Sequence, residues 1–196
     1  MTSAPLTKDN NERDSPPATK RVVLGFSGGL DTSFCVKYLT EEKGCEVHGI
    51  IVNTGGFSDD ELKKIEEHAY NLGVKTHTTV NAITNYYDRI IKYLVFGNVL
   101  KNNTYPLSVS AERLIQALHI AEHVKKLNAD AVAHGSTGAG NDQVRFDMVF
   151  HIMIPDVEII TPIRDLKLSR EQEIEYLKSK NVKLLKVIVQ TITKLS

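Results

Sequence analysis

Short apolar runs alternate with longer stretches in which apolar residues recur at helical spacing. Runs typical of buried parallel strands lie at residues 22–24, 47–52, 75–80, 129–133 and 158–160. The helical pattern covers residues 32–42, 62–72, 82–93, 114–127, 144–154 and 169–180. Strands that alternate with helices in this way predict an α/β fold, a doubly wound parallel five-stranded sheet with helices on both faces.

Local signals add detail to this pattern. Ser58 with Glu61, and Ser169 with Gln172, have the spacing of capping boxes that open helices. The tyrosines of residues 82–93 recur with isoleucines at near-helical spacing, so we expect them in the core. Residues 98–110 are polar and turn-like, and we expect there a loop that could reach a ligand.

The charges of the chain balance. Lys plus Arg and Asp plus Glu each total 24, which argues against the broad basic face of a nucleic-acid-binding protein. No run approaches the roughly 18 apolar residues of a membrane span, and the first twenty residues hold no apolar signal region. Cys35 and Cys45 lack metal-type spacing and are expected to be reduced packing residues. We expect a cytoplasmic protein with no nucleic-acid or membrane partner.

The composition also divides the chain. Residues 1–20 are rich in Ser, Thr, Asn, Pro and mixed charge, which predicts a disordered tail. Residues 21–180 form the one expected domain, and residues 181–196 form an apolar, lysine-studded tail suited to an edge strand or an exposed, aggregation-prone segment. His119 and His123 have the spacing of zinc ligands, but no third ligand follows, so we expect two partly exposed histidines.

The first candidate for chemistry follows the first apolar run. Its two adjacent glycines let the backbone approach a ligand closely, and the helix that follows offers unpaired N–H groups and a positive dipole end. Ser27, Thr32 and Ser33 could donate to phosphate oxygens, and Asp31 could hold Mg²⁺ or cap the helix. An ordinary strand-to-helix turn needs fewer of these residues. We therefore interpret residues 25–33 as a phosphate loop, made of Gly25, Phe26, Ser27, Gly28, Gly29, Leu30, Asp31, Thr32 and Ser33.

This loop differs from a Walker A loop, because no lysine follows Gly28 or Gly29. The segment Ser-Gly-Gly-Leu-Asp-Thr-Ser resembles the pyrophosphate loop of ATP pyrophosphatases, which cleave ATP between the α and β phosphates. The resemblance implies adenylation rather than transfer of the γ-phosphoryl group.

A second unusual loop, residues 134–146, follows the fourth apolar run. It concentrates glycines, hydroxyls and amides with Asp142 and Arg145 at the carboxyl end of a predicted strand, where open α/β sheets bind ligands. Arg145 could contact a carboxylate and Asp142 an ammonium, so the ligand suggested is amino-acid-like. A turn whose side chains cap the next helix would explain Asn141 or Asp142 singly but not the whole set.

Together, Ser-Gly-Gly-Leu-Asp-Thr-Ser at residues 27–33 and Gly-Ser-Thr-Gly-Ala-Gly-Asn-Asp-Gln-Val-Arg-Phe at residues 135–146 resemble the argininosuccinate synthase family. The resemblance runs over about residues 21–180 and implies an adenine nucleotide alpha hydrolase-like, Rossmann-like nucleotide-binding domain. It also implies a ligase of arginine biosynthesis that uses ATP and Mg²⁺. ATP activates citrulline as citrullyl-AMP with release of pyrophosphate, and the amine of aspartate then displaces AMP. The full-length family forms homotetramers.

The resemblance also implies roles for single residues. ATP contacts fall on residues 25–33, on Val52 and on Gly135. Citrulline contacts fall on Tyr105, Ser110, Asn141 and Arg145, and aspartate contacts fall on Thr137, Asn141 and Asp142. Of these we expect Asp31, Asp142 and Arg145 to carry the reaction.

The chain departs from the family pattern in three places. Ala139 stands where many members carry lysine, residues 106–113 differ around the retained Tyr105 and Ser110, and the chain ends where a long second domain would follow. Two alternatives therefore stay open beside the ligase. One is a non-catalytic ATP-binding fragment or regulatory module, and the other is a different adenylating enzyme, such as a tRNA-thiolating or amidotransferase-type synthetase.

Overall fold

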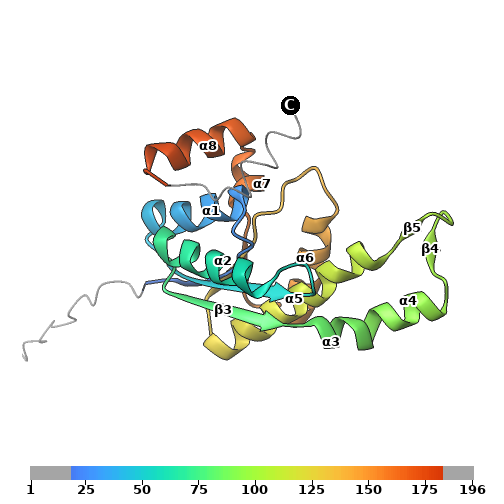
Figure 1. The fold of residues 1–196 in the computed structure, drawn as a ribbon. Helices are drawn as coiled ribbons and strands as arrows, with labels where there is room; N and C mark the ends of the chain where they lie inside the picture. The colour runs from blue at the N-terminus through green and yellow to red at the C-terminus, as the bar shows by residue number, and fades with distance from the viewer. Residues whose placement is uncertain (1–18, 183–196) are drawn as a thin grey trace, which may run out of the picture.

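The computed structural model describes residues 19–182, and its centre is a sheet of five parallel strands (Figure 1). The strand order is β3-β2-β1-β6-β7. The strands are β1 (Arg21–Gly25), β2 (Glu46–Asn53), β3 (Thr76–Asn81), β6 (Ala131–Ala133) and β7 (Glu158–Ile160). The predicted α/β class and the parallel five-stranded sheet are confirmed.

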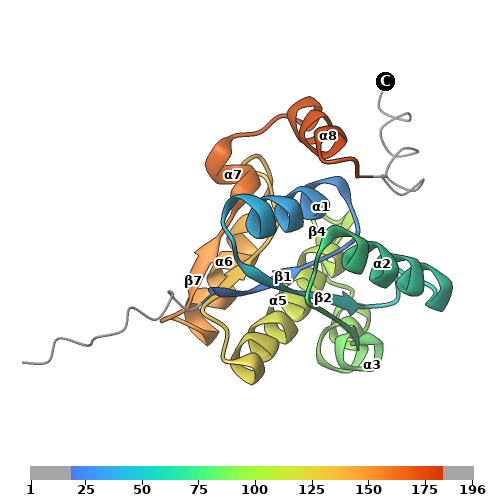
Figure 2. The same ribbon diagram turned by 90° about the vertical axis from the view of Figure 1, so that its left-hand side faces the viewer.

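Helices cover both faces of the sheet, because successive residues of a strand point to opposite sides. Val22 and Leu24 of β1 pack with α1 (Leu30–Lys37), α2 (Asp59–Leu72), α7 (Pro162–Leu166) and α8 (Arg170–Ser179). Val23 packs on the other side with α5 (Ser108–Leu127) and α6 (Asp142–Met153). Figure 2 shows α1 and α2 on one side of β1 and β2 and α5 on the other.

The local signals of the sequence are borne out at the helix ends. Both predicted capping boxes form, at Ser58 with Glu61 and at Ser169 with Gln172. Gly73 ends α2 in the left-handed conformation, with φ of 105°. The first predicted helix is divided, since α1 passes into the π-helical turn η1 (Tyr38–Glu42). The short helix α7 was not expected, although Pro162 at its first turn is a typical helix start.

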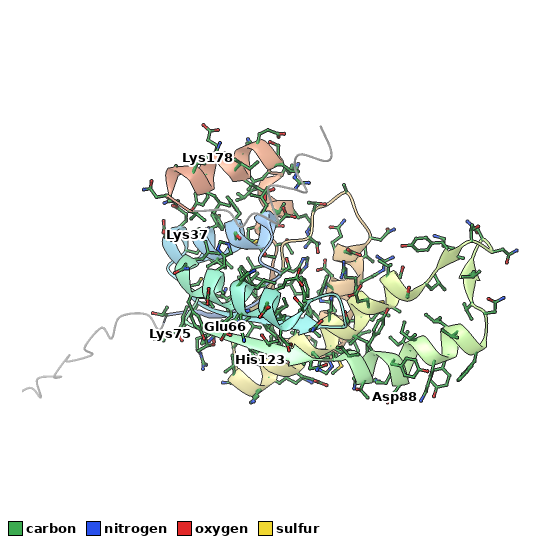
Figure 3. The ribbon with its side chains drawn as sticks, in the orientation of Figure 1. Lys37, Glu66, Lys75, Asp88, His123 and Lys178 are labelled. Atoms are coloured by element: carbon green, nitrogen blue, oxygen red, sulfur yellow. The ribbon has the colours of Figure 1, made fainter. Side chains whose placement is uncertain are left out.

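Residues 83–106 form an arm that stands away from the body of the domain (Figure 1). It consists of α3 (Ile83–Tyr86), η2 (Tyr87–Ile91), α4 (Lys92–Phe96) and a small antiparallel pair, β4 (Leu100–Lys101) and β5 (Tyr105–Pro106). Figure 3 shows Asp88 on this arm, away from the body. The arm occupies part of the predicted polar loop, and its short strand pair was not predicted.

The expectation that the tyrosines of this segment lie in the core is wrong for Tyr87 and Tyr93. Tyr87 is 52% exposed and Tyr93 is 62% exposed, since no other element of the described domain covers their side of the arm. Only Tyr86 is partly buried, and its hydroxyl donates to the carbonyl of Ser108 at 2.6 Å. Helical spacing thus predicted the helix correctly but not a partner for its apolar face.

Several sequence expectations lie outside the described residues. The predicted tails at residues 1–20 and 181–196 fall there except for residues 19, 20, 181 and 182.

Each helix within residues 19–182 is too short or too polar to cross a bilayer. Cys35 is buried and Cys45 is partly buried, and both are free thiols.

Candidate active site

The two glycine-rich loops predicted from the sequence meet at one edge of the sheet. β1 pairs with both β2 and β6, so the chain connections run in opposite directions from β1 and a crevice opens beyond the carboxyl ends of β1 and β6. A Cβ atom on Gly135 would lie only 3.2 Å from Cβ of Asp31 and 3.3 Å from Cγ2 of Thr32. The second loop therefore touches the phosphate loop, and this contact leaves no room for a larger residue at position 135.

Glycine is needed in the phosphate loop for two physical reasons. Gly28 has φ of 74°, which side chains rarely tolerate, and a Cβ atom there would lie 3.1 Å from Cγ1 of Ile65 on α2. Gly29 is the N-cap of α1 and supplies no side-chain cap. The N–H groups of the first turn of α1 are therefore not bound by a capping side chain, as an anion site requires.

The hydroxyls of the phosphate loop hold its own backbone. Ser33 is fully buried, and its hydroxyl donates to the carbonyl of Gly29 at 2.7 Å and lies 3.0 Å from Nε2 of His68. Thr32 bonds to the same carbonyl at 3.2 Å. The expectation that the Ser33 hydroxyl donates to phosphate oxygens conflicts with this arrangement, because its proton is used inside the loop. Ser27 is the exposed hydroxyl of the three.

His68 fixes this arrangement from α2. The imidazole is 5% exposed, and burial lowers its pKa below the ordinary value. The ring is therefore neutral at physiological pH and can share one hydrogen bond with Ser33. This contact could not be predicted from the sequence, since His68 lies on the buried face of an amphipathic helix.

Asp31 does not cap α1, which corrects one of its two expected roles. Its carboxylate lies beside Glu173 of α8, whose side chain is 1% exposed. Burial, followed by the neighbouring charge of Asp31, raises the pKa of Glu173 to about 8. Oε2 of Glu173 has no hydrogen-bond partner among the described residues. Glu173 is therefore the carboxyl group of this pair that keeps its proton at neutral pH.

A chain of hydrogen bonds from the buried His134 to the partly buried Asp147 and Arg164 holds the second loop. The N–H of Ser136 donates to Nδ1 of His134 at 3.3 Å, so Nε2 of His134 carries the proton and donates to Asp147 at 2.9 Å. Asp147 also accepts from Nη1 of Arg164 at 2.6 Å. Burial lowers the pKa of His134 despite the adjacent carboxylate, which keeps the ring neutral. Arg164 thus supports the second loop through Asp147.

Asp142 is clamped by two guanidinium groups. It accepts from Nη1 of Arg145 at 2.6 Å and from Nε of Arg113 at 3.1 Å, while Nη2 of Arg145 donates to Ser110 at 3.0 Å. The side chain of Asn141 makes no capping bond to α6, so the capping interpretation of this loop fails at that residue. Arg145, Ser110 and Asp142 are therefore brought together across α5 and α6.

A cavity of about 1000 Å³ lies between the loops. Most of the predicted site residues line it: Gly25, Phe26, Ser27, Gly28, Gly29, Leu30, Asp31, Thr32, Val52, Gly135, Thr137 and Asp142. Ser33, Ser110, Asn141 and Arg145 lie outside its lining, and Tyr105 lies on the arm, 49% exposed. The phosphate-loop residues are therefore grouped around the cavity, whereas the expected citrulline residues lie outside its lining.

Several cavity residues were missed in the sequence. Glu112 of α5 accepts from the hydroxyl of Thr54, which follows β2, and joins two walls of the cavity. Lys64 of α2 and Arg170 of α8 also line it. Each lies on a helix face that is indistinguishable from a solvated surface in the sequence, so only the packing of α2 and α8 against α1 identifies them.

Comparisons with known proteins agree with the fold. The family model described as the arginosuccinate synthase N-terminal HUP domain matches residues 21–183. The argininosuccinate synthase of Saccharolobus solfataricus is 42% identical over 162 residues, which are 83% of this chain and 41% of the relative. That of Methanocaldococcus jannaschii is 42% identical over 160 residues, 82% of this chain and 40% of the relative.

The argininosuccinate synthase of Pyrobaculum aerophilum is 41% identical over 158 residues, 81% of this chain and 39% of the relative. The chain thus spans about two fifths of the length of these curated relatives. The match covers both glycine-rich loops and every strand of the sheet. The chain belongs to the argininosuccinate synthase family, within its N-terminal HUP domain.

Proposed function

We propose that this chain binds ATP in the cavity between the two loops, with the phosphates at the N-terminus of α1. The observation that carries the proposal is the phosphate loop itself, in which Gly28 and Gly29 bring uncapped backbone N–H groups to the cavity. Val52 and Gly135 line the same cavity on either side of β1 and are proposed to contact the nucleoside.

We further propose the family reaction for the protein to which this domain contributes. The ureido oxygen of citrulline attacks the α-phosphorus of ATP and pyrophosphate leaves, giving citrullyl-AMP. The amine of aspartate then attacks the ureido carbon, AMP leaves, and argininosuccinate forms. No covalent nucleophile from the protein is required, so positioning and charge neutralisation are the expected sources of catalysis.

Magnesium belongs to this proposal as part of the substrate MgATP. Within residues 19–182, no three His, Cys, Asp or Glu side chains are grouped so that they could hold a metal ion by themselves. The donor set therefore fits an ion carried by the phosphates better than a resident metal. Asp31 lines the cavity next to the phosphate loop and is the carboxylate proposed to complete such an ion's coordination.

The amino-acid substrates are assigned to the second loop and the start of α5. Thr137 and Asn141 are exposed on the loop and are proposed to contact aspartate with Asp142. Arg145, Ser110, Asn141 and Tyr105 are proposed to contact citrulline. Because Asp142 is already bound by Arg113 and Arg145, we propose that it acts on aspartate as part of this charged group. A homotetramer, the assembly that the resemblance implies for the full-length family, is the proposed assembly.

A second candidate is an ATP-binding module without turnover. The observation that favours it is the position of Tyr105, which lies on the exposed arm and outside the lining of the cavity. In such a module the phosphate loop would bind ATP while citrulline would lack a complete site.

Pyrophosphate release from ATP in the presence of citrulline and aspartate tests the two candidates. Release that needs both amino acids supports the ligase, and saturable ATP binding in calorimetry without release supports the module. Pyrophosphate release that is equal without either amino acid would contradict the assignment to this ligase.

A pair of substitutions tests the division of roles inside the site. Asp31→Ala is expected to weaken MgATP binding, because it removes a carboxylate beside the phosphate loop. Asp142→Ala is expected to leave ATP binding unchanged and to impair the use of aspartate, because it removes the carboxylate that both Arg113 and Arg145 bind. Equal loss of ATP affinity in the two variants would refute the division.

A further inference from the structure

The charges around the cavity pose a problem for a polyphosphate ligand. Its lining includes the carboxylates of Asp31, Glu61, Glu112 and Asp142, and ATP would add several negative charges beside them. Backbone N–H groups neutralise only part of such a charge. The cavity therefore needs cationic side chains that are not already paired.

Most of the nearby cations are engaged. Arg113 binds Asp142, and its Nη1 lies 3.6 Å from Oε2 of Glu112. Arg145 binds Asp142 and Ser110. In the second loop, Ala139 supplies only a methyl group and no charge. Within residues 19–182, Lys64 and Arg170 are the lining cations that form no ion pair.

The two free cations flank the phosphate loop from opposite sides. In both Figure 1 and Figure 2, α1 lies between α2 and α8. Lys64 is adjacent to Ile65, the residue of α2 that lies against Gly28 of the loop. Arg170 opens α8 one turn before Glu173, the residue beside Asp31. Each helix therefore brings one positive side chain to the N-terminus of α1.

We propose that Lys64 and Arg170 form a cationic clamp on the β- and γ-phosphates of ATP. The inference rests on the proposed ATP-binding function and adds two residues to it. When the bond between the α-phosphorus and the bridging oxygen breaks, the electron pair stays on the departing pyrophosphate. The clamp neutralises the charge that develops there.

The test compares ligands with and without these phosphates. Lys64→Ala in the full chain is expected to raise the Kd for MgATP about tenfold, as the loss of a charge-assisted hydrogen bond does, and to leave the Kd for AMP within about twofold. Inorganic pyrophosphate should compete with ATP less well in this variant than in the unmodified chain. Lys64→Arg should restore most of the affinity for ATP, because it keeps the positive charge.

Matched controls exist on the same helices. Lys63 neighbours Lys64 on α2, and Lys178 lies on α8 with Arg170, yet neither lines the cavity. Lys63→Ala and Lys178→Ala should bind ATP as the unmodified chain does. Arg170→Ala should bind ATP more weakly and AMP with unchanged affinity. Thermal unfolding of each variant verifies that the fold is retained.

The outcomes separate this inference from the proposed function. An unmodified chain that does not bind ATP would refute the proposed function and the clamp with it. If the unmodified chain binds ATP but Lys64→Ala binds it equally well, the clamp is wrong and the ATP site stands. The same holds if Lys64→Ala loses as much affinity for AMP as for ATP. Loss of affinity in Lys63→Ala equal to that in Lys64→Ala would also overturn the clamp.

Discussion

The phosphate loop and the arm differ in how far their apolar side chains are buried. Phe26 and Leu30 of the loop are at most 3% exposed and pack in one core cluster with residues of α1 and α2. The loop presents its backbone to the cavity. Phe96 of the arm is 81% exposed and Val95 is 66% exposed. The loop is therefore held in shape by the domain itself, while the arm is held mainly by its own helical hydrogen bonds.

This difference bears on the two halves of the proposed site. Residues expected to contact ATP sit on elements buried in the core, so the chain alone can preorganise them. Tyr105, expected to contact citrulline, sits on the arm, where little of the domain restrains it. The comparison therefore predicts that substitutions near the loop have large effects on stability and ATP binding, and that substitutions on the arm have small ones.

The largest effect is expected from Gly28→Ala. The alanine would have to adopt φ of 74°, and its Cβ atom would lie 3.1 Å from Cγ1 of Ile65. We therefore expect a loss of about 2 kcal/mol in unfolding free energy. ATP affinity should fall at least about tenfold, because the loop backbone must move. Urea unfolding and calorimetry measure the two effects.

Gly44→Ala is the matched control for backbone strain. Gly44 has φ of 62°, but a Cβ atom there would meet nothing within 4 Å. The control should lose about 1 kcal/mol and keep its ATP affinity. If both variants lose ATP affinity alike, the loop is not held by its contact with Ile65.

The next effect is expected from Asp147→Ala, which removes the acceptor between His134 and Arg164. It leaves the buried Nε2–H of His134 without its partner, so we expect a loss of about 1.5 kcal/mol in unfolding free energy. Asp156→Ala, at an exposed position that forms no ion pair within residues 19–182, should stay within about 0.5 kcal/mol. Equal stability of the two variants would show that this chain of hydrogen bonds does not hold the second loop.

The sequence was informative wherever a local pattern decides the structure. Apolar runs located the strands, and Ser58 and Ser169 located two helix starts, because these signals act over a few residues. It could not reveal that Asp142 is bound by Arg113, or that Glu173 faces Asp31, because those contacts join different helices. Such contacts depend on how α5 lies against α6 and α8 against α1.

Glu173 gives the third prediction, a pH dependence of stability. Its pKa is raised to about 8 in the folded chain, whereas an unfolded glutamate titrates near pH 4.3. As pH rises between these values, the unfolded state loses its proton first, so the stability of the folded chain should fall toward pH 8. The charged groups around it are Asp31, which raises the pKa, and Arg170, which lowers it.

Glu173→Gln removes this titration and keeps a neutral hydrogen-bond donor. The variant should be more stable than the unmodified chain by at least about 1 kcal/mol at pH 8, and similar to it at pH 5, in urea unfolding at the two pH values. Glu175→Gln, exposed on the same helix, is the control and should show no such difference. Equal stability of Glu173→Gln and the unmodified chain at pH 8 would mean that Glu173 is ionised without cost.

The arm marks the limit of what periodicity alone can predict. The spacing of Tyr86, Tyr87 and Tyr93 indicated a helix with an apolar face, and the structure has the helical turns. Whether such a face is buried depends on a second surface, and the described residues supply one for Tyr86 but leave Tyr87 and Tyr93 exposed. Burial of this segment therefore could not be predicted from helical spacing alone.

The smallest effect is expected from Phe96→Ser at the end of α4. Because the ring is 81% exposed, its removal gives up little buried surface, and the unfolding free energy should change by less than about 0.5 kcal/mol. Phe26→Ser, by contrast, removes a ring that is 1% exposed and should unfold much of the population. If Phe96→Ser destabilises the chain by more than about 1 kcal/mol in urea unfolding, the arm is packed in solution and the contrast with the phosphate loop does not hold.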